Sequence, residues 1–186
     1  MAATPSLKVT KSMTYKGGTR TWSNRYHFNG GTPADSAHWT TLSDAIVTAE
    51  KATLPSAQTI VATTGYAAGS DVPVFSKTYS TAGTLSTGTD VDTPGDCAAL
   101  VRYSTAARTP KNHPVYLFNY VHGPYRSTAG ADTLGTAQKT ALGTYASSWI
   151  SGFSDGTNTY NRAGPNGASA TGSLVSTYIT HRDFPR

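Results

Sequence analysis

The chain begins with two alternating, aromatic-rich runs, residues 7–15 and 19–28, separated by Lys16-Gly17-Gly18. Alternation of apolar and polar residues with a period of two is typical of half-buried β-strands. A short glycine-containing connection between two such runs predicts a β-hairpin. Threonine and glycine are abundant along the whole chain, and threonine favours pleated surfaces while glycine favours turns. The sequence therefore predicts a domain built mainly from β-strands.

An amphipathic helix is predicted directly after the hairpin. Thr32 suits the N-cap, Pro33 the first helical position and Asp35 the acidic first turn. The helix is expected to end near Ala52, ahead of a proline. Apolar residues at helical spacing mark the face that turns to the core: Trp39, Leu42, Ile46 and Ala49.

The remainder of the chain predicts more strands and a second helix. The apolar run VYLFNYV, residues 115–121, is bracketed by prolines and predicts a central strand buried on both faces. A second helix is expected over 134–149, with Gly152 just past its end. Its core face is expected to comprise Leu134, Gln138, Ala141, Tyr145 and Trp149. Further strands are expected at 58–64, 72–79, 98–105 and 174–181.

These elements predict one domain, residues 1–186, with about eight strands, two helices and no internal sequence repeat. No apolar stretch is long enough for a transmembrane helix, and residues 1–9 lack the apolar region of a secretory signal. The single cysteine, Cys97, forms no internal disulfide and is interpreted as a small buried residue. We therefore expect no membrane contact and synthesis in a cytosol.

Positive charge is concentrated at the N-terminal end. Only 13% of residues are charged, yet the first 34 residues include five cations and no acid. The net charge of this segment therefore equals the net charge of the whole chain, +5. Such asymmetry points to a polyanion, most commonly nucleic acid, although solvated charges on exposed strands are the alternative. The candidate nucleic-acid-binding residues are Lys8, Lys11, Lys16, Arg20 and Arg25. A secondary basic segment without acids contains Arg102, Arg108 and Lys111.

The segment WSNRYHF, residues 22–28, places aromatic and polar residues on opposite faces of one predicted strand. Aromatic rings could stack bases while the cations neutralise phosphates. The alternative is a half-buried strand whose aromatic face packs into the core.

No catalytic or metal-binding motif is present. The five histidines do not occur at metal-ligand spacing, and His113 and His122 are the only basis for a hydrolase. The loop containing Asp90, Asp92 and Asp96 lacks the spacing of an EF-hand and is interpreted as turn-forming. We therefore expect no enzyme activity, no cofactor and no metal.

The segments RTWSNRYHFNGGTPADSAHWTTL (20–42) and RTPKNHPVYLFNYVHG (108–123) resemble capsid proteins of circular single-stranded DNA viruses and their uncultured relatives. The resemblance implies an antiparallel β-sandwich of the single jelly-roll type with two inserted helices. Two features depart from that pattern: the chain has five dispersed cations instead of a dense arginine-rich arm, and its helices are long for a jelly roll. An α+β coat fold is therefore the alternative.

The resemblance implies a structural protein that self-assembles into a closed icosahedral-type shell around a small, single-stranded genome. Its partners would be many copies of itself and the packaged nucleic acid, and its location the virion after synthesis in the host cytoplasm. The low charge density agrees, because hydroxyl side chains are buried at an interface at lower cost than charged ones. The alternative function is a non-catalytic, β-rich module that binds carbohydrate or another surface, with tryptophan and tyrosine as stacking platforms.

Overall fold

The computed structural model describes residues 3–15, 18–54, 56, 58–84, 97–108, 114–125, 136–163 and 172–180. Only the backbone is described for Tyr15, 97–108, 114–125, 136–139, Leu142 and 172–180. The elements in chain order are β1 (Ser6–Tyr15), β2 (Gly18–His27), α1 (Ser36–Lys51), β3 (Thr59–Tyr66), β4 (Pro73–Ala82), β5 (Cys97–Arg108), β6 (Pro114–Tyr125), α3 (Thr136–Ser151), β7 (Phe153–Ser154), β8 (Thr159–Tyr160) and β9 (Gly172–Thr180).

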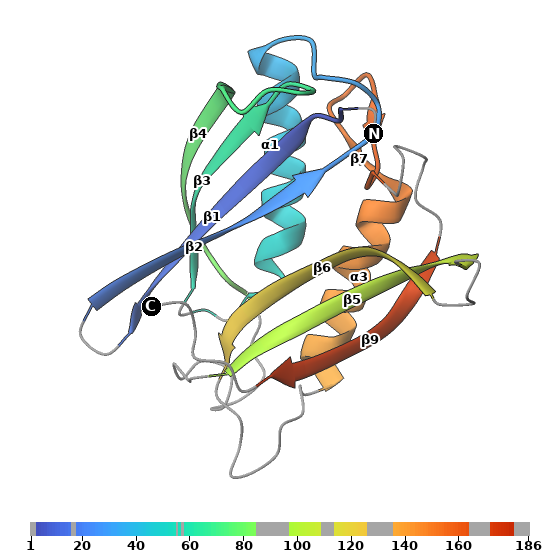
Figure 1. The fold of residues 1–186 in the computed structure, drawn as a ribbon. Helices are drawn as coiled ribbons and strands as arrows, with labels where there is room; N and C mark the ends of the chain where they lie inside the picture. Colours follow the sequence, from blue (N-terminus) through green and yellow to red (C-terminus); the bar gives the residue numbers. More distant parts are fainter. Residues whose placement is uncertain are drawn as a thin grey trace.

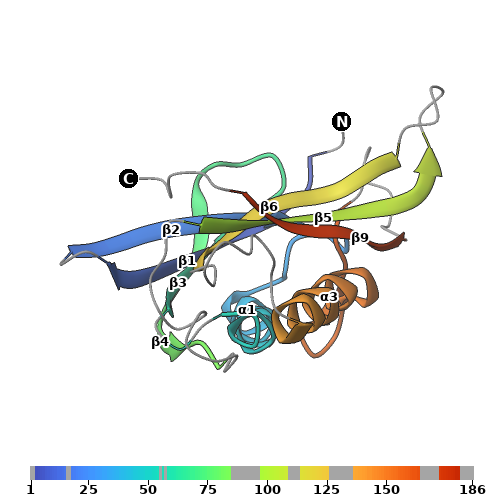
Figure 2. The same ribbon diagram turned by 90° about the horizontal axis from the view of Figure 1, so that it is seen from below.

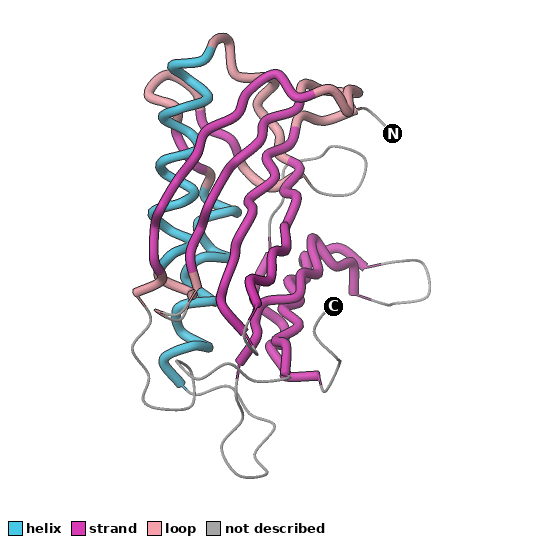
Figure 3. The backbone as a smooth tube through the Cα atoms, turned by 90° about the vertical axis from the view of Figure 1, so that its left-hand side faces the viewer, coloured by secondary structure: helices cyan, strands magenta, loops and turns pink. Residues whose placement is uncertain are grey.

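The described strands form two larger antiparallel sheets and one short ribbon. Their orders are β2-β1-β3-β4, β6-β5-β9 and β7-β8. Figure 1 shows the two larger sheets with α1 and α3 behind them, and Figure 2 shows both helices side by side on one side of the strands. Figure 3 shows the long strands of the first sheet running along the helices. The described part of the chain therefore consists of a layer of strands over a layer of helices.

The two larger sheets share one connectivity. In each, a hairpin and a helix precede a strand that pairs with the first strand of the hairpin: β1-β2-α1-β3 in the first, and β5-β6-α3-β9 in the second, where the β7-β8 ribbon comes between α3 and β9. β2 and β3 are both antiparallel to β1 and so run parallel to each other, with α1 connecting them. β6 and β9 flank β5 in the same way, with α3 between them in the chain. The structure thus repeats a topological unit that the sequence does not reveal.

Aromatic side chains pack the first sheet against both helices. Tyr26 on β2 stacks on Trp149 of α3 with ring centroids 4.9 Å apart. Trp39 on α1 stacks on Phe75 of β4 with centroids 5.7 Å apart. The buried cluster comprises Leu7, Val9, Tyr26, Phe28, Trp39, Leu42, Ile46, Val47, Leu54, Ile60, Phe75, Tyr145, Ala146, Trp149, Phe153 and Tyr160. Trp39, Leu42 and Ile46 of the first predicted core face and Tyr145 and Trp149 of the second are members, and Ala49 and Ala141 pack against the cluster while partly buried, which confirms these positions. Leu134 and the side chain of Gln138 lie outside the described part of the chain.

The predicted hairpin is confirmed by the continuous pairing from Ser6↔His27 to Tyr15↔Gly18. The predicted start of the first helix is wrong. Asp35, not Thr32, is the N-cap, because its extended backbone lets the side chain accept hydrogen bonds from the amides of the next turn. The end near Ala52 is confirmed, and Gly152 has the positive φ of +97° expected of a residue that follows a helix.

The predicted fold class is confirmed at its coarse level: the described part of the chain is mainly β, with an antiparallel four-stranded sheet and two helices. A jelly roll with eight strands is not confirmed, since the order β2-β1-β3-β4 is not that of a Greek key. The run 115–121 was expected in the centre of a sheet, but β6 is at the edge of its sheet among the described strands. An apolar run does not by itself specify which strands lie beside it.

Trp39 packs α1 closely against the first sheet. Its side chain is buried, and a Cβ placed on Gly65 of β3 would lie 2.7 Å from its ring, so the helix approaches the backbone of the strand closely. The Phe28 ring packs edge-to-face with the Trp39 ring at a centroid distance of 6.1 Å.

We predict that Trp39→Ala lowers the free energy of unfolding by about 3–5 kcal/mol, because it leaves a cavity under the sheet. Urea denaturation measures the change. Thr48→Ala, on the exposed side of the same helix, is the matched control and is expected to change stability by less than about 0.5 kcal/mol. Equal midpoints for the two variants would contradict the packing described for Trp39.

Candidate functional site

The first sheet has an inner face, toward the helices, and an outer face. Its four strands contain no Asp or Glu. Side chains on the outer face are exposed or half-buried over most of its extent, and most of them are hydroxyls. The cations in these strands are Lys8, Lys11, Arg20, Arg25 and Lys77.

Lys11 is a correction to the predicted nucleic-acid-binding set. It shares the inner face of β1 with Leu7 and Val9, and its side chain is fully buried. Its Nζ lies 2.5 Å from Glu50 Oε1 and 2.5 Å from Asn24 Oδ1. A buried ammonium must be paired, and Glu50 in the last turn of α1 provides the pairing charge. Lys11 is therefore not available to a phosphate.

Glu50 has two further partners in the core. The Tyr26 hydroxyl donates to Oε1 at 3.2 Å, and the Tyr145 hydroxyl donates to Oε2 at 2.9 Å. The resulting network joins β1, β2, α1 and α3 through the buried side chains of Lys11, Glu50, Tyr26 and Tyr145 and the half-buried side chain of Asn24. Because its two charged groups are fully buried, its role is to hold these elements together.

Lys8 and Arg25 are the two predicted residues that the structure brings together. They are directly opposite each other in the β1–β2 register and on the outer face. Arg25 donates from Nε to Ser6 Oγ at 2.8 Å and from Nη1 to Asp71 Oδ1 at 2.9 Å. Its guanidinium also lies over the Tyr66 ring, 4.2 Å from the centroid.

The other predicted cations do not join this pair. Arg20 is exposed, but it is opposite Met13 in the register and so belongs to the inner-face side, near the end of the hairpin. Lys16 and Lys111 lie outside the described residues. Arg102 and Arg108 are on β5, where only the backbone is described.

The aromatic residues of 22–28 belong to the inner face. Tyr26 and Phe28 are buried in the core, and Trp22 is half-buried. For Tyr26 and Phe28 the structure therefore supports the second interpretation, in which the aromatic face packs into the core. Their rings have no exposed surface on which a base could stack.

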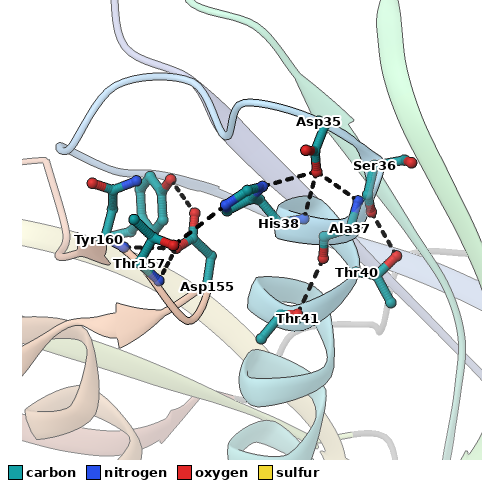
Figure 4. Close-up of polar contacts among 10 residues, drawn as sticks. Asp35, Ser36, Ala37, His38, Thr40, Thr41, Asp155, Thr157 and Tyr160 are labelled. Atoms are coloured by element: carbon teal, nitrogen blue, oxygen red, sulfur yellow. Dashed lines mark hydrogen bonds and ion pairs between the residues drawn. The ribbon is translucent and has the colours of Figure 1, made fainter.

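A second polar cluster, which the sequence analysis did not single out, lies at the start of α1 (Figure 4). Asp35 Oδ1 accepts hydrogen bonds from the amides of Ala37 and His38 and lies 2.8 Å from His38 Nδ1. The other ring nitrogen of His38 lies 3.5 Å from Thr157 Oγ1, in the turn between β7 and β8. The hydrogen bond to Asp35 raises the pKa of His38 above its ordinary value. The Asp-x-x-His spacing at a helix start is the only sequence signal for this contact.

Asp155 anchors the facing turn. Its carboxylate accepts from the amides of Thr157 and Asn158 at 2.9 and 2.7 Å and from the Tyr160 hydroxyl at 2.5 Å. Burial opposes its charged form, but these hydrogen bonds outweigh the burial and lower the pKa of Asp155. Burial and the adjacent carboxylate raise the pKa of Tyr160 to about 12.

Carboxylate, imidazole and hydroxyl follow one another in Asp35, His38 and Thr157, as they do in hydrolytic triads. The amides of residues 155–158, however, all donate within the turn or to its side chains, and so are not oriented toward an oxyanion. The cluster is therefore best described as a contact that joins α1 to the β7–β8 ribbon. His113 lies outside the described residues, and His122 is on β6, where only the backbone is described.

Within the ranges that the structure describes, no three His, Cys, Asp or Glu side chains are placed to hold a metal ion. The loop with Asp90, Asp92 and Asp96 lies outside those ranges. Among the described helices, none combines the length and apolar character required to cross a membrane. Comparisons with protein-family models, curated proteins and solved structures find no match to this chain. The functional interpretation therefore depends on the residues themselves.

The contact of His38 with Asp35 predicts a pH dependence of stability. The pKa of His38 is raised in the folded state. The contact therefore contributes its full stabilisation of the fold when the pH is below the ordinary histidine pKa, about 6.5. This stabilisation is lost as the pH rises through the folded-state pKa. We expect the difference in melting temperature between wild type and His38→Gln to shrink as the pH rises from 5.5 to 8. These two pH values lie about one unit or more below and above the ordinary histidine pKa.

His27 provides the matched control. Burial, Arg162 and Arg25 lower the pKa of His27, so its contribution has the opposite sign and is lost as the pH falls. His27→Gln should therefore lose stability relative to wild type most at high pH. A His38→Gln difference that is constant across this range would contradict the described contact.

Proposed function

We propose that this chain is the shell protein of a small virus, assembling in many copies around a single-stranded genome after synthesis in a host cytoplasm. The observation that carries the proposal is the outer face of the first sheet. Most of its side chains are exposed or half-buried, most of them are hydroxyls, and its strands contribute Lys8 and Arg25 but no carboxylate. A face of this kind suits contact with a large polyanion.

The composition supports assembly for a separate reason. A shell subunit covers much of its surface with neighbouring copies, and each charged group covered in this way must be paired. Threonine and serine need only hydrogen bonds, which makes their burial less costly. A charged fraction of 13% is therefore suited to a protein whose exterior becomes interface.

Two coat folds are compatible with this function. The layering of two helices on one side of the strands favours the α+β alternative. A jelly-roll β-sandwich would require the two larger sheets to pack face to face. We therefore propose an α+β coat protein built from two topologically related units.

The alternative function, a carbohydrate- or surface-binding module, has less support. Trp39 and Trp149 are in the core, so Trp22 is the one tryptophan that retains partial exposure. Carbohydrate modules need exposed aromatic platforms, and the outer face presents hydroxyls instead.

We expect the purified full-length chain to form closed particles of uniform size, because shell contacts are heterologous and close on themselves. Sedimentation velocity measures the mass, and negative-stain electron microscopy shows whether the particles are closed. The series should include low and moderate salt, with and without added single-stranded DNA. A monomer or small oligomer under every condition would contradict the proposed function.

A further inference from the structure

Lys8 and Arg25 form a like-charge pair across two neighbouring strands. Residues directly opposite in an antiparallel pair have Cβ atoms about 4.5–5.5 Å apart, and like charges at this spacing are destabilising. Among the described residues bonded to this pair, the one carboxylate is that of Asp71, from the connection between β3 and β4. Its side chain is 92% exposed, and exposed ion pairs contribute little to stability. The pair therefore retains much of its capacity to bind an anion.

Hydroxyl groups surround the two cations. The register places Thr64 of β3 beside Lys8, and Ser76 of β4 beside Thr64, so one row of side chains crosses all four strands. In the next row, Thr10 and Ser23 are opposite each other with their oxygens 3.0 Å apart. Ammonium, guanidinium and hydroxyl groups all donate hydrogen bonds to phosphate oxygens.

We propose that this face binds the sugar–phosphate backbone of single-stranded nucleic acid, with Lys8 and Arg25 contacting about two phosphates per chain. The proposal rests on the shell function and specifies the surface that meets the genome. Charge complementarity favours nucleic acid as the ligand of this face. The four strands contain no acid, and two of their cations, Lys8 and Arg25, are adjacent on the outer face.

The same face has little means to recognise bases. Tyr26 and Phe28 are turned into the core, and the Arg25 guanidinium lies over the ring of Tyr66, which is itself 8% exposed. The lowered pKa of His27 keeps this neighbour of Arg25 uncharged at neutral pH. Contacts to phosphates alone position a strand without reading its sequence, as packaging of a whole genome requires.

The test measures binding of the full-length chain to a fluorescent oligothymidylate by anisotropy over a salt series. Two phosphates on a single strand predict a slope of log K against log salt of about −1.4, whereas five would give about −3.5. Lys8→Gln combined with Arg25→Gln should flatten the slope by about 1.4. Lys16→Gln combined with Arg20→Gln removes the same charge from the same segment and should leave most of the slope intact.

Two further measurements test the mode of binding. Asp71→Asn removes the carboxylate that competes for Arg25, so it should tighten binding at constant salt. An abasic oligonucleotide of equal length should bind within about threefold of oligothymidylate, because lost base stacking would weaken binding by far more. The inference is overturned if the salt dependence follows Lys16 and Arg20, if Asp71→Asn binds no more tightly, or if the abasic strand binds at least tenfold more weakly.

Particle formation is recorded in parallel to separate this inference from the shell function. If Lys8→Gln/Arg25→Gln particles form normally but contain less nucleic acid, measured by their ultraviolet absorbance ratio, the inference is supported. If the wild-type chain forms no particles, the shell function fails, while the salt slopes still decide whether this face binds nucleic acid.

Discussion

The ion pair between Lys11 and Glu50, with its hydrogen-bond partners, links two strands of the first sheet to both described helices. Lys11 extends from β1, Asn24 and Tyr26 from β2, Glu50 from α1 and Tyr145 from α3, and their polar groups meet at the buried ion pair. Removing one partner of a buried ion pair leaves an uncompensated charge, at a cost of about 3–5 kcal/mol. The pair therefore favours the one packing of sheet and helices in which both charges are satisfied.

This pair also changes the interpretation of the basic N-terminal segment. The fold assigns Lys11 to the core and leaves Lys8 and Arg25 adjacent on the outer face. Lys77 of β4 likewise faces α1, where its Nζ contacts Asp44 at 2.6 Å. Lys11 and Lys77 thus pair with carboxylates of α1 on the inner face, whereas Lys8 and Arg25 lie on the outer face. The candidate interface is smaller than the cluster of charges in the sequence suggests.

Local patterns predicted much of the fold and little of its polar interior. The faces of both helices follow from periodicity, as Trp39 and Trp149 show. The alternation along β1 places Lys11 with Leu7 and Val9, but its partner Glu50 is 39 residues away, and no local rule identifies it. The contact between His38 and Thr157 spans 119 residues and was missed for the same reason. The repeated connectivity of the two sheets was hidden because it is a property of strand pairing and not of residue identity.

A double-mutant cycle on Lys11 and Glu50 tests most directly whether Lys11 belongs to the core. Lys11→Met keeps an unbranched side chain, one atom shorter and without the charge. Glu50→Gln keeps an oxygen that accepts from one tyrosine hydroxyl and adds an NH2 group that can donate to the oxygen of the other. The free energies of unfolding of wild type, both single variants and the double variant are measured by urea denaturation. We predict that the double variant is more stable than the sum of the single effects implies, by about 1–3 kcal/mol. Additive effects would contradict the buried pair and would return Lys11 to the surface.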